Sequence, residues 1–171
     1  MSRAPRIALL AFLTIYGVVC LRTPDSFRLL DNVDLAIHET GHLVFAPFGE
    51  FVAVFGGTLF QLLVPAVFVG SFWRRGDRFA ALVTLWWVAQ NCWNIARYIA
   101  DARAQLLPLV GGGEHDWAYL LDDLGLLSHD QVIASTVRGV GALLLVISVA
   151  GAFVVLPPAE GSPKLYDHDA D

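Results

Sequence analysis

The sequence predicts an all-α integral membrane protein, a helical bundle of about four transmembrane helices plus a short helix that carries the motif HETGH. Two observations support this prediction. The chain is 56% hydrophobic and only 16% charged, whereas soluble domains contain about 25% charged residues. The apolar residues also gather in long stretches, and we expect one membrane-embedded domain at 1–157 and a disordered acidic tail at 158–171.

The first apolar stretch, Ile7 to Leu21, follows Arg3 and Arg6. It has the length of a signal peptide, but no small-x-small cleavage site follows it, so we interpret it as a retained anchor. Each of the later stretches approaches the roughly 20 residues that a bilayer requires. They run from Phe51 to Trp73, from Phe79 to Ile95 and from Val137 to Leu156.

The arginines indicate how these spans are oriented. Two precede the first span, and three more lie in the very short loop WRRGDR at 73–78, while the other polar segments contain more acidic than basic residues. Because positive charge favours the cytoplasmic side, we expect both clusters and both termini there. The segments at 22–50 and 101–135 then share the outer side.

The motif HETGH places His38 and His42 four residues apart, with Glu39 directly after the first histidine. In a helix, positions i and i+4 lie on one face, so both imidazoles can bind one Zn²⁺ ion while the glutamate acts as general base on a water. The alternative is a pair of core histidines. The apolar flanks favour the metal site, because they offer no evident partner for three buried polar groups.

The HETGH helix is expected to begin near Asp31 to Asp34 and to break at Pro47 and Gly49. Its length of about 15 residues, or some 22 Å, falls short of the roughly 30 Å of a bilayer core. We therefore expect a re-entrant or interfacial helix, with a short helix packed inside the protein as the alternative.

A zinc site needs a third protein ligand, and the candidates lie in the second outer segment. His115 is the first choice and Asp116 the second, both at the start of an expected amphipathic surface helix. Asp101 and Glu50 are lesser candidates. The alternative for this pair is an aspartate that caps the helix beside an exposed histidine.

Polar residues also recur along the apolar stretches at helical spacing. We expect Gln61, Gln90 and Asn94 to face inward and to contact the substrate, although hydrogen bonds between helices explain the same spacing. Cys20 and Cys92 both fall in apolar stretches, which makes a disulfide unexpected. The net charge of −5 argues against nucleic acid as a partner.

The stretch IHETGHLVFAPFG, followed by GGTLFQLLVPAVF, resembles the core of membrane zinc metallopeptidases of the site-2 protease type. This likeness covers residues 38–68. From 33 to 127 the chain also resembles small bacterial HExxH integral membrane proteins with a later ADAR…HDWxYLL stretch, which implies a multi-pass protein of the bacterial inner membrane. The site-2 type takes its third ligand from an LDG or PDG aspartate that this sequence lacks, so Asp116 or Asp101 would have to substitute.

The resemblance implies His38 and His42 as zinc ligands and Glu39 as the base of a metallopeptidase. Partners would be the lipid bilayer and a peptide substrate. Two alternatives remain open at this point: a zinc-dependent hydrolase of lipid amides or esters, since the same attack by water serves any acyl group, and a non-catalytic metal-binding membrane protein.

Overall fold

The structure is a computed structural model that describes residues 2–109 and 114–158. Within these ranges every regular element is helical, which confirms the all-α prediction. The expected acidic tail lies outside the described residues from 159 onward, as do the three glycines of the loop before Glu114.

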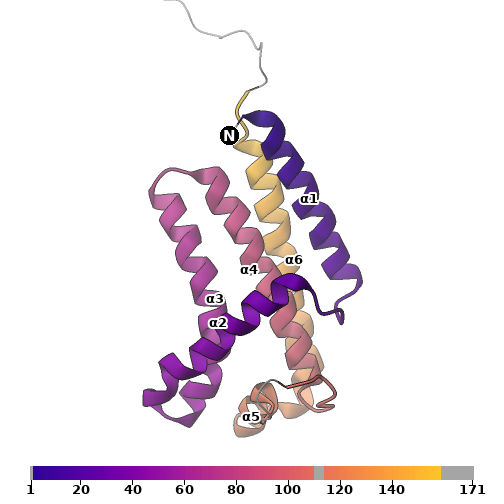
Figure 1. Cartoon of the computed structure of the whole chain (residues 1–171). Helices are drawn as coiled ribbons and strands as arrows, with labels where there is room; N and C mark the ends of the chain where they lie inside the picture. The colour runs from indigo at the N-terminus through magenta and orange to yellow at the C-terminus, as the bar shows by residue number, and fades with distance from the viewer. Residues whose placement is uncertain (1, 110–113, 159–171) are drawn as a thin grey trace, which may run out of the picture.

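Four long helices run along the bundle, while α2 lies obliquely across them and the short α5 lies at the end opposite the N-terminus (Figure 1). One 3₁₀ turn, Ala46–Phe48, follows α2, and another, Leu127–His129, precedes α6. The helices are α1 (Arg3–Arg22), α2 (Leu29–Phe45), α3 (Glu50–Arg74), α4 (Arg78–Asp101), α5 (Asp116–Asp123) and α6 (Asp130–Val154).

Three helices among the described residues, rather than the expected four, are long and apolar enough to cross a membrane. They are α1, α3 and the stretch Leu127–Val154 that contains α6. Helix α4 has 24 residues, but polar side chains such as Gln90, Asn91 and Arg97 lower its hydropathy. It is also the most buried helix, so its neighbours rather than lipid surround much of its surface.

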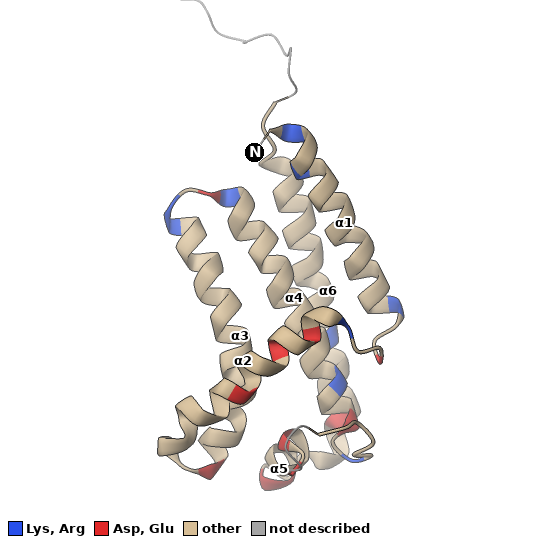
Figure 2. Cartoon of the chain, viewed as in Figure 1, with Lys and Arg blue, Asp and Glu red and all other residues tan. Residues whose placement is uncertain are grey.

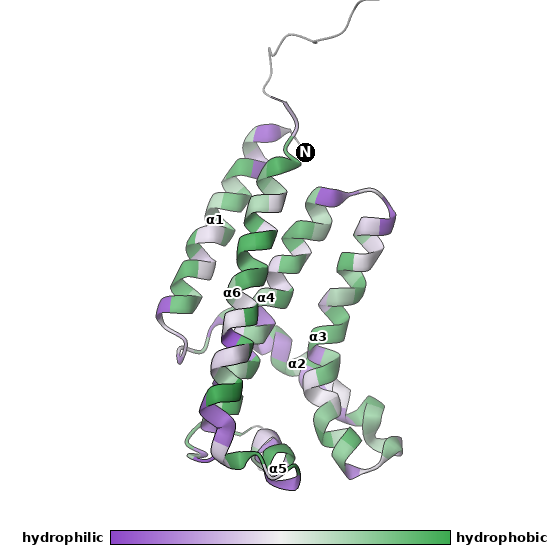
Figure 3. Cartoon of the chain, turned by 180° about the vertical axis from the view of Figure 1, so that it is seen from behind, coloured by the Kyte–Doolittle hydropathy of each residue, from purple (hydrophilic) through white to green (hydrophobic). Residues whose placement is uncertain are grey.

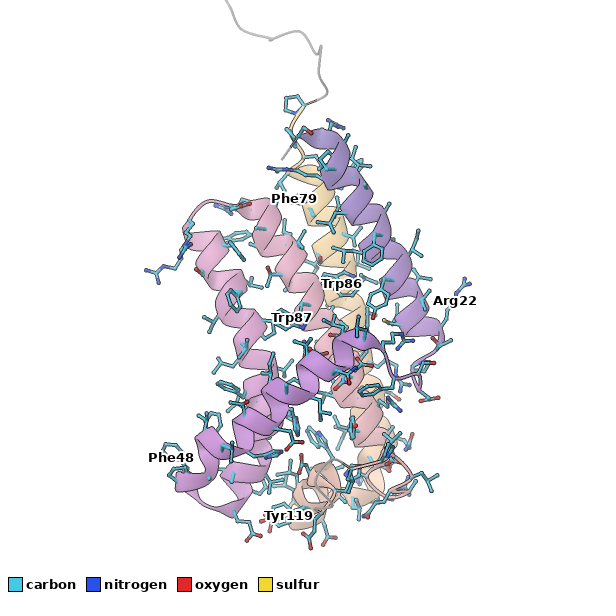
Figure 4. All side chains as sticks on the ribbon, in the orientation of Figure 1. Arg22, Phe48, Phe79, Trp86, Trp87 and Tyr119 are labelled. Atoms are coloured by element: carbon cyan, nitrogen blue, oxygen red, sulfur yellow. The ribbon has the colours of Figure 1, made fainter. Side chains whose placement is uncertain are left out.

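Small residues let α6 pack closely on α4, as is usual between helices in membranes. A Cβ atom at Gly141 would lie 2.5 Å from the indole nitrogen of Trp93. Farther along the same contact, the hydroxyl of Ser148 donates a hydrogen bond of 2.7 Å to the carbonyl of Leu82. The side chains of Phe79 and Trp86 lie along this central helix (Figure 4).

Buried acids attach α2 to the bundle. The carboxylate of Asp31 accepts hydrogen bonds from the backbone N–H of Arg28 (2.6 Å), which caps the helix, and from the side chain of Gln90 (2.8 Å). One turn later, Asp34 accepts a bond of 2.8 Å from the indole of Trp87, which lies where α2 crosses α4 (Figure 4). Two acids at the start of α2 therefore fix its crossing point.

Helix α2 has 17 residues and is not among the three possible spans, in agreement with a helix too short to cross a bilayer. It ends at Phe45, two residues before Pro47, whose ring cannot continue the helix. The chain then turns through Gly49, whose φ of 99° favours glycine, directly into α3. This sharp return brings the second half of α2 against the first half of α3.

Charge and hydropathy divide the bundle into two ends. Five of the ten described arginines lie at the end that holds the N-terminus and the α3–α4 turn, where Asp77 is the one described acid. Most acids lie at the other end, in α2, α5 and their surroundings, together with the remaining arginines (Figure 2). The long helices are mainly apolar between these ends (Figure 3). The guanidinium of Arg3 donates a bond of 2.7 Å to the carbonyl of Pro157, so the first and last described segments meet at the basic end.

Candidate metal centre

The two histidines of HETGH point from α2 toward one carboxylate on α5. Their rings lie one helical turn apart, with centroids separated by 4.7 Å and planes at 81°. Oxygen Oδ2 of Asp116 lies 2.8 Å from Nε2 of His38 and 3.2 Å from Nε2 of His42. One oxygen and two imidazole nitrogens thus converge from segments that are 78 residues apart in the sequence.

The other ring nitrogens face oxygen acceptors. Nδ1 of His38 lies 3.1 Å from Oε1 of Gln61, and Nδ1 of His42 lies 2.9 Å from the backbone carbonyl of Ala53. A carbonyl oxygen only accepts, so these contacts favour the tautomer with hydrogen on Nδ1 and a lone pair on Nε2. The amide of Gln61 donates in turn to Oδ1 of Asn94 (2.9 Å), which sets its orientation.

This tautomer leaves two lone pairs and a carboxylate oxygen facing one another with no hydrogen between them. Such an arrangement is repulsive unless a proton or a metal cation lies there. Without a metal, a proton between these atoms would relieve the repulsion. In agreement with this, the hydrogen bond to Asp116 raises the pKa of His42 to about 9. Burial raises the pKa of Asp116, but hydrogen bonds to His38 and His42 outweigh it and bring the value down to about 2.

Gly57 on α3 explains how the imidazoles find room. A Cβ atom there would lie 2.6 Å from Nε2 of His38 and 2.7 Å from Nε2 of His42. Gly41 on α2 similarly faces the backbone of Gly56 on α3. The absence of side chains at these positions lets α2 and α3 approach each other and leaves the two Nε2 atoms uncovered.

The donor set suits zinc, since two neutral imidazole nitrogens and one carboxylate oxygen are a usual set of three protein ligands for this ion. The three ligand atoms lie within 4.8 Å of one another. Partners on Nδ1 that orient a ligating histidine are also typical of metal sites. His38, His42 and Asp116 therefore fit a zinc ion on the chemistry and placement of their own atoms.

His115 is not part of this group. Its Nδ1 accepts the backbone N–H of Ala118 at 3.2 Å and so caps α5, and its Nε2 lies 3.5 Å from Oδ2 of Asp101. The preference for His115 over Asp116 as third ligand is thus reversed by the geometry. Asp101 itself accepts the backbone N–H groups of Leu106 and Leu107, both at 2.9 Å, and stabilises the loop after α4.

A cavity of about 290 Å³ opens beside the three ligand atoms. Its wall includes Glu39, an exposed residue of α2. Its apolar part is formed by side chains from six segments, among them Leu35 on α2, Val54 on α3 and Ile95 on α4. The space is large enough for a small acyl compound and close to the candidate ligands.

Two of the three residues expected to contact substrate line this cavity. Gln61 and Asn94 do so, but Gln61 contacts the imidazole of His38 and is itself hydrogen-bonded to Asn94. Both residues therefore orient His38, a candidate metal ligand. Gln90 lies outside the cavity wall and binds Asp31. The two polar residues of α4 therefore have different roles: Gln90 attaches α2 to the bundle, and Asn94 orients Gln61.

Several residues in the wall were not recognised as site residues in the sequence. Tyr98 and Tyr119 bring phenol groups, Glu114 brings a carboxylate, and Thr58 has a buried hydroxyl with no hydrogen-bond partner. Three of them had a signal in the sequence: Thr58 precedes Gln61 by three residues, Tyr98 follows Asn94 by four, and Glu114 lies two residues before Asp116. Tyr119 belongs to the apolar residues of the expected surface helix and had none.

Comparison of the chain with family models, with curated proteins and with solved structures finds no match.

Proposed function

We propose that this protein is a membrane-embedded zinc-dependent hydrolase, with peptide bonds as its first expected substrate. The observation that carries the proposal is the meeting of both HETGH imidazoles with the Asp116 carboxylate beside a cavity that Glu39 also lines. An HExxH glutamate has a chemical task only where water and an acyl group can reach the metal, and the cavity offers that space.

The chain's own residues divide the work of hydrolysis. His38, His42 and Asp116 would hold a zinc ion, which would supply Lewis acidity at this place. Glu39 would take a proton from the water that attacks the acyl carbon and deliver it to the amine that leaves as the C–N bond breaks. The unpartnered hydroxyl of Thr58 is available to donate a hydrogen bond to the acyl oxygen.

We also propose that the protein resides in the bacterial inner membrane with its basic end in the cytoplasm. The arginine-rich end in Figure 2 supports this orientation through the preference of positive charge for the cytoplasmic side. The metal centre and α5 then belong to the outer half of the molecule. A reporter fused after the last residue should give a cytoplasmic signal, and an extracytoplasmic signal would contradict the orientation.

Metal analysis of the purified protein in detergent tests the centre. We expect about one zinc ion per chain, and we expect Asp116→Ala to lose it as His38→Ala and His42→Ala do. Asp122→Ala, on the same helix but outside the cavity wall, is the matched control and should retain zinc. Full zinc content in the double variant that lacks both histidines would refute the site.

Catalysis is tested by Glu39→Gln, which should keep zinc and abolish hydrolysis. Peptides and lipids from membranes that contain the wild type or this variant are compared by mass spectrometry. Accumulation of uncleaved peptides with the variant supports a peptidase, and accumulation of acylated lipids supports hydrolysis of lipid amides or esters. Identical profiles with equal zinc content would indicate a metal-binding protein without hydrolase activity.

A further inference from the structure

The wall of the metal cavity contains several carboxylates and no lysine or arginine among the described residues. Besides the proposed ligand Asp116 and the proposed base Glu39, it includes Asp31, Glu50 and Glu114. A zinc ion with two neutral histidines and one aspartate leaves a formal charge of +1, whereas the other four acids together carry −4. The cavity therefore remains negative with metal bound.

Two of these acids are free to meet a ligand. Both oxygens of Asp31 already accept hydrogen bonds within the protein, and Glu39 is assigned to the water. Glu50, the first residue of α3, and Glu114, just before α5, are exposed at the cavity, and their side chains make no hydrogen bond or ion pair with another described residue. Both act on the same group, because burial and then the nearby charges of Glu50, Asp123 and Glu114, in that order, raise the pKa of Tyr119.

Two arginines of this region line a neighbouring cavity rather than the metal cavity. Arg28 and Arg97 lie in the wall of this much smaller cavity, which shares Asp31 and Asn94 with the metal cavity. The guanidinium of Arg97 lies 5.8 Å from the ring centre of Phe27, a residue that lines the metal cavity. Phe27 thus presents its ring to the metal cavity while the positive charge lies against that ring.

Two other features indicate that the cavity is built for a ligand. The hydroxyl of Thr58 is buried, lacks a hydrogen-bond partner among the described residues and belongs to a cavity-lining residue. Aromatic rings of Tyr98, Trp117 and Tyr119 also line it, and such rings attract organic cations as well as apolar groups.

We infer that the substrate is a peptide that carries an ammonium group, either a lysine side chain or a free N-terminus, bound by Glu50 and Glu114 while an apolar portion occupies the rest of the cavity. This inference rests on the proposed zinc hydrolase. An acyl compound with a phosphate or carboxylate near the scissile bond would meet four like charges, so anionic substrates are disfavoured.

Hydroxamates are suitable probes, because they bind zinc without being hydrolysed and so report on the cavity independently of turnover. Four are titrated calorimetrically into the zinc-loaded protein in detergent. N-acetyl-norleucine hydroxamate is neutral, N-acetyl-lysine hydroxamate adds an ammonium to the side chain, norleucine hydroxamate has a free α-amino group, and N-acetyl-glutamate hydroxamate is negative. The second and third probes separate the two sources of the ammonium group.

We expect at least one ammonium probe to bind about five- to tenfold more tightly than the neutral probe, the size expected for two partly exposed charge pairs, and the glutamate probe to bind most weakly. The advantage should shrink in 0.5 M NaCl, at roughly three times physiological ionic strength. In Glu50→Gln, Glu114→Gln and the double variant it should fall stepwise to less than about twofold, with the affinity of the neutral probe unchanged. Asp122→Asn, which removes an acid of α5 outside the cavity wall, should preserve it.

Equal affinity for the neutral and ammonium probes would overturn the inference and leave the hydrolase proposal standing. An advantage that persists in the double variant with full zinc content would overturn the assignment to Glu50 and Glu114. Failure of all four hydroxamates to bind the zinc-loaded protein would refute the proposed hydrolase site itself, and this inference with it.

Discussion

Replacing Asp34 with asparagine should stabilise the protein at neutral pH. This side chain is fully buried on α2, one carboxylate oxygen accepts the indole N–H of Trp87, and the other oxygen has no hydrogen-bond partner. Burial raises the pKa of Asp34 from its ordinary value of 3.8 to about 6. Because the folded state holds this proton more tightly than the unfolded state, the penalty is absent below pH 3.8, grows as the pH rises and is complete above pH 6.

The magnitude follows from the two pKa values. At 1.36 kcal/mol for each pH unit, the difference corresponds to about 3 kcal/mol of lost stability above pH 6, or about 6–12 °C in Tm for a chain of this size. Asparagine keeps an oxygen for Trp87 and adds N–H donors where Gln90 and Asn91 have unpartnered oxygens. Thermal unfolding in detergent, followed by tryptophan fluorescence between pH 4 and 8, measures the difference.

Asp31→Asn is the matched control on the same helix. Both oxygens of Asp31 accept N–H groups, so asparagine would place a donor against a donor and should lower Tm. The two similar substitutions, three residues apart, are thus expected to have opposite effects at pH 7. Equal destabilisation by both, or a gain for Asp34→Asn that does not depend on pH, would refute the reasoning.

Three further substitutions test close contacts and the metal centre. Gly57→Ala should lower zinc content, because the new Cβ atom would lie 2.6 Å from Nε2 of His38, whereas Gly70→Ala has nothing within 4 Å and should not; metal analysis decides. Gly141→Ala should destabilise the α4–α6 contact by about 1–3 kcal/mol in thermal unfolding, and Gly139→Ala, which faces open space, should not destabilise it. Gln61→Leu should weaken zinc affinity about 10- to 100-fold in competition with a chelator, since His38 loses the acceptor on Nδ1, and unchanged affinity would show that this contact does not orient the ring.

The helices were largely predictable from hydropathy and breakers, but the role of α4 was not. Its apolar residues are frequent enough to suggest a span, whereas two of its amides are explained only by what surrounds them. Gln90 meets an acid of α2 and Asn94 meets an amide of α3, partners that adjoin them only after folding. Hydropathy describes a helix against lipid, so it misjudges one that is enclosed by other helices.

In the candidate site, the histidine pair could be predicted directly from helical spacing. The choice between His115 and Asp116 as the third metal ligand depended on the exact residue at which α5 begins. A capping side chain turns back to the backbone, while the next residue points away from the helix, so a shift of one position exchanges the roles of His115 and Asp116. Capping preferences favour aspartate over histidine. The buried contact of His115 near Asp101 overrides that preference and directs Asp116 to the histidines.

The short length of α5 has a consequence for how ligands influence one another. This helix of eight residues supplies one proposed ligand from Asp116 and one cavity wall from Tyr119 (Figure 4). Metal that binds Asp116 and substrate that binds Tyr119 would both favour the same position of the helix. By thermodynamic reciprocity, each should increase the affinity of the protein for the other by the same factor.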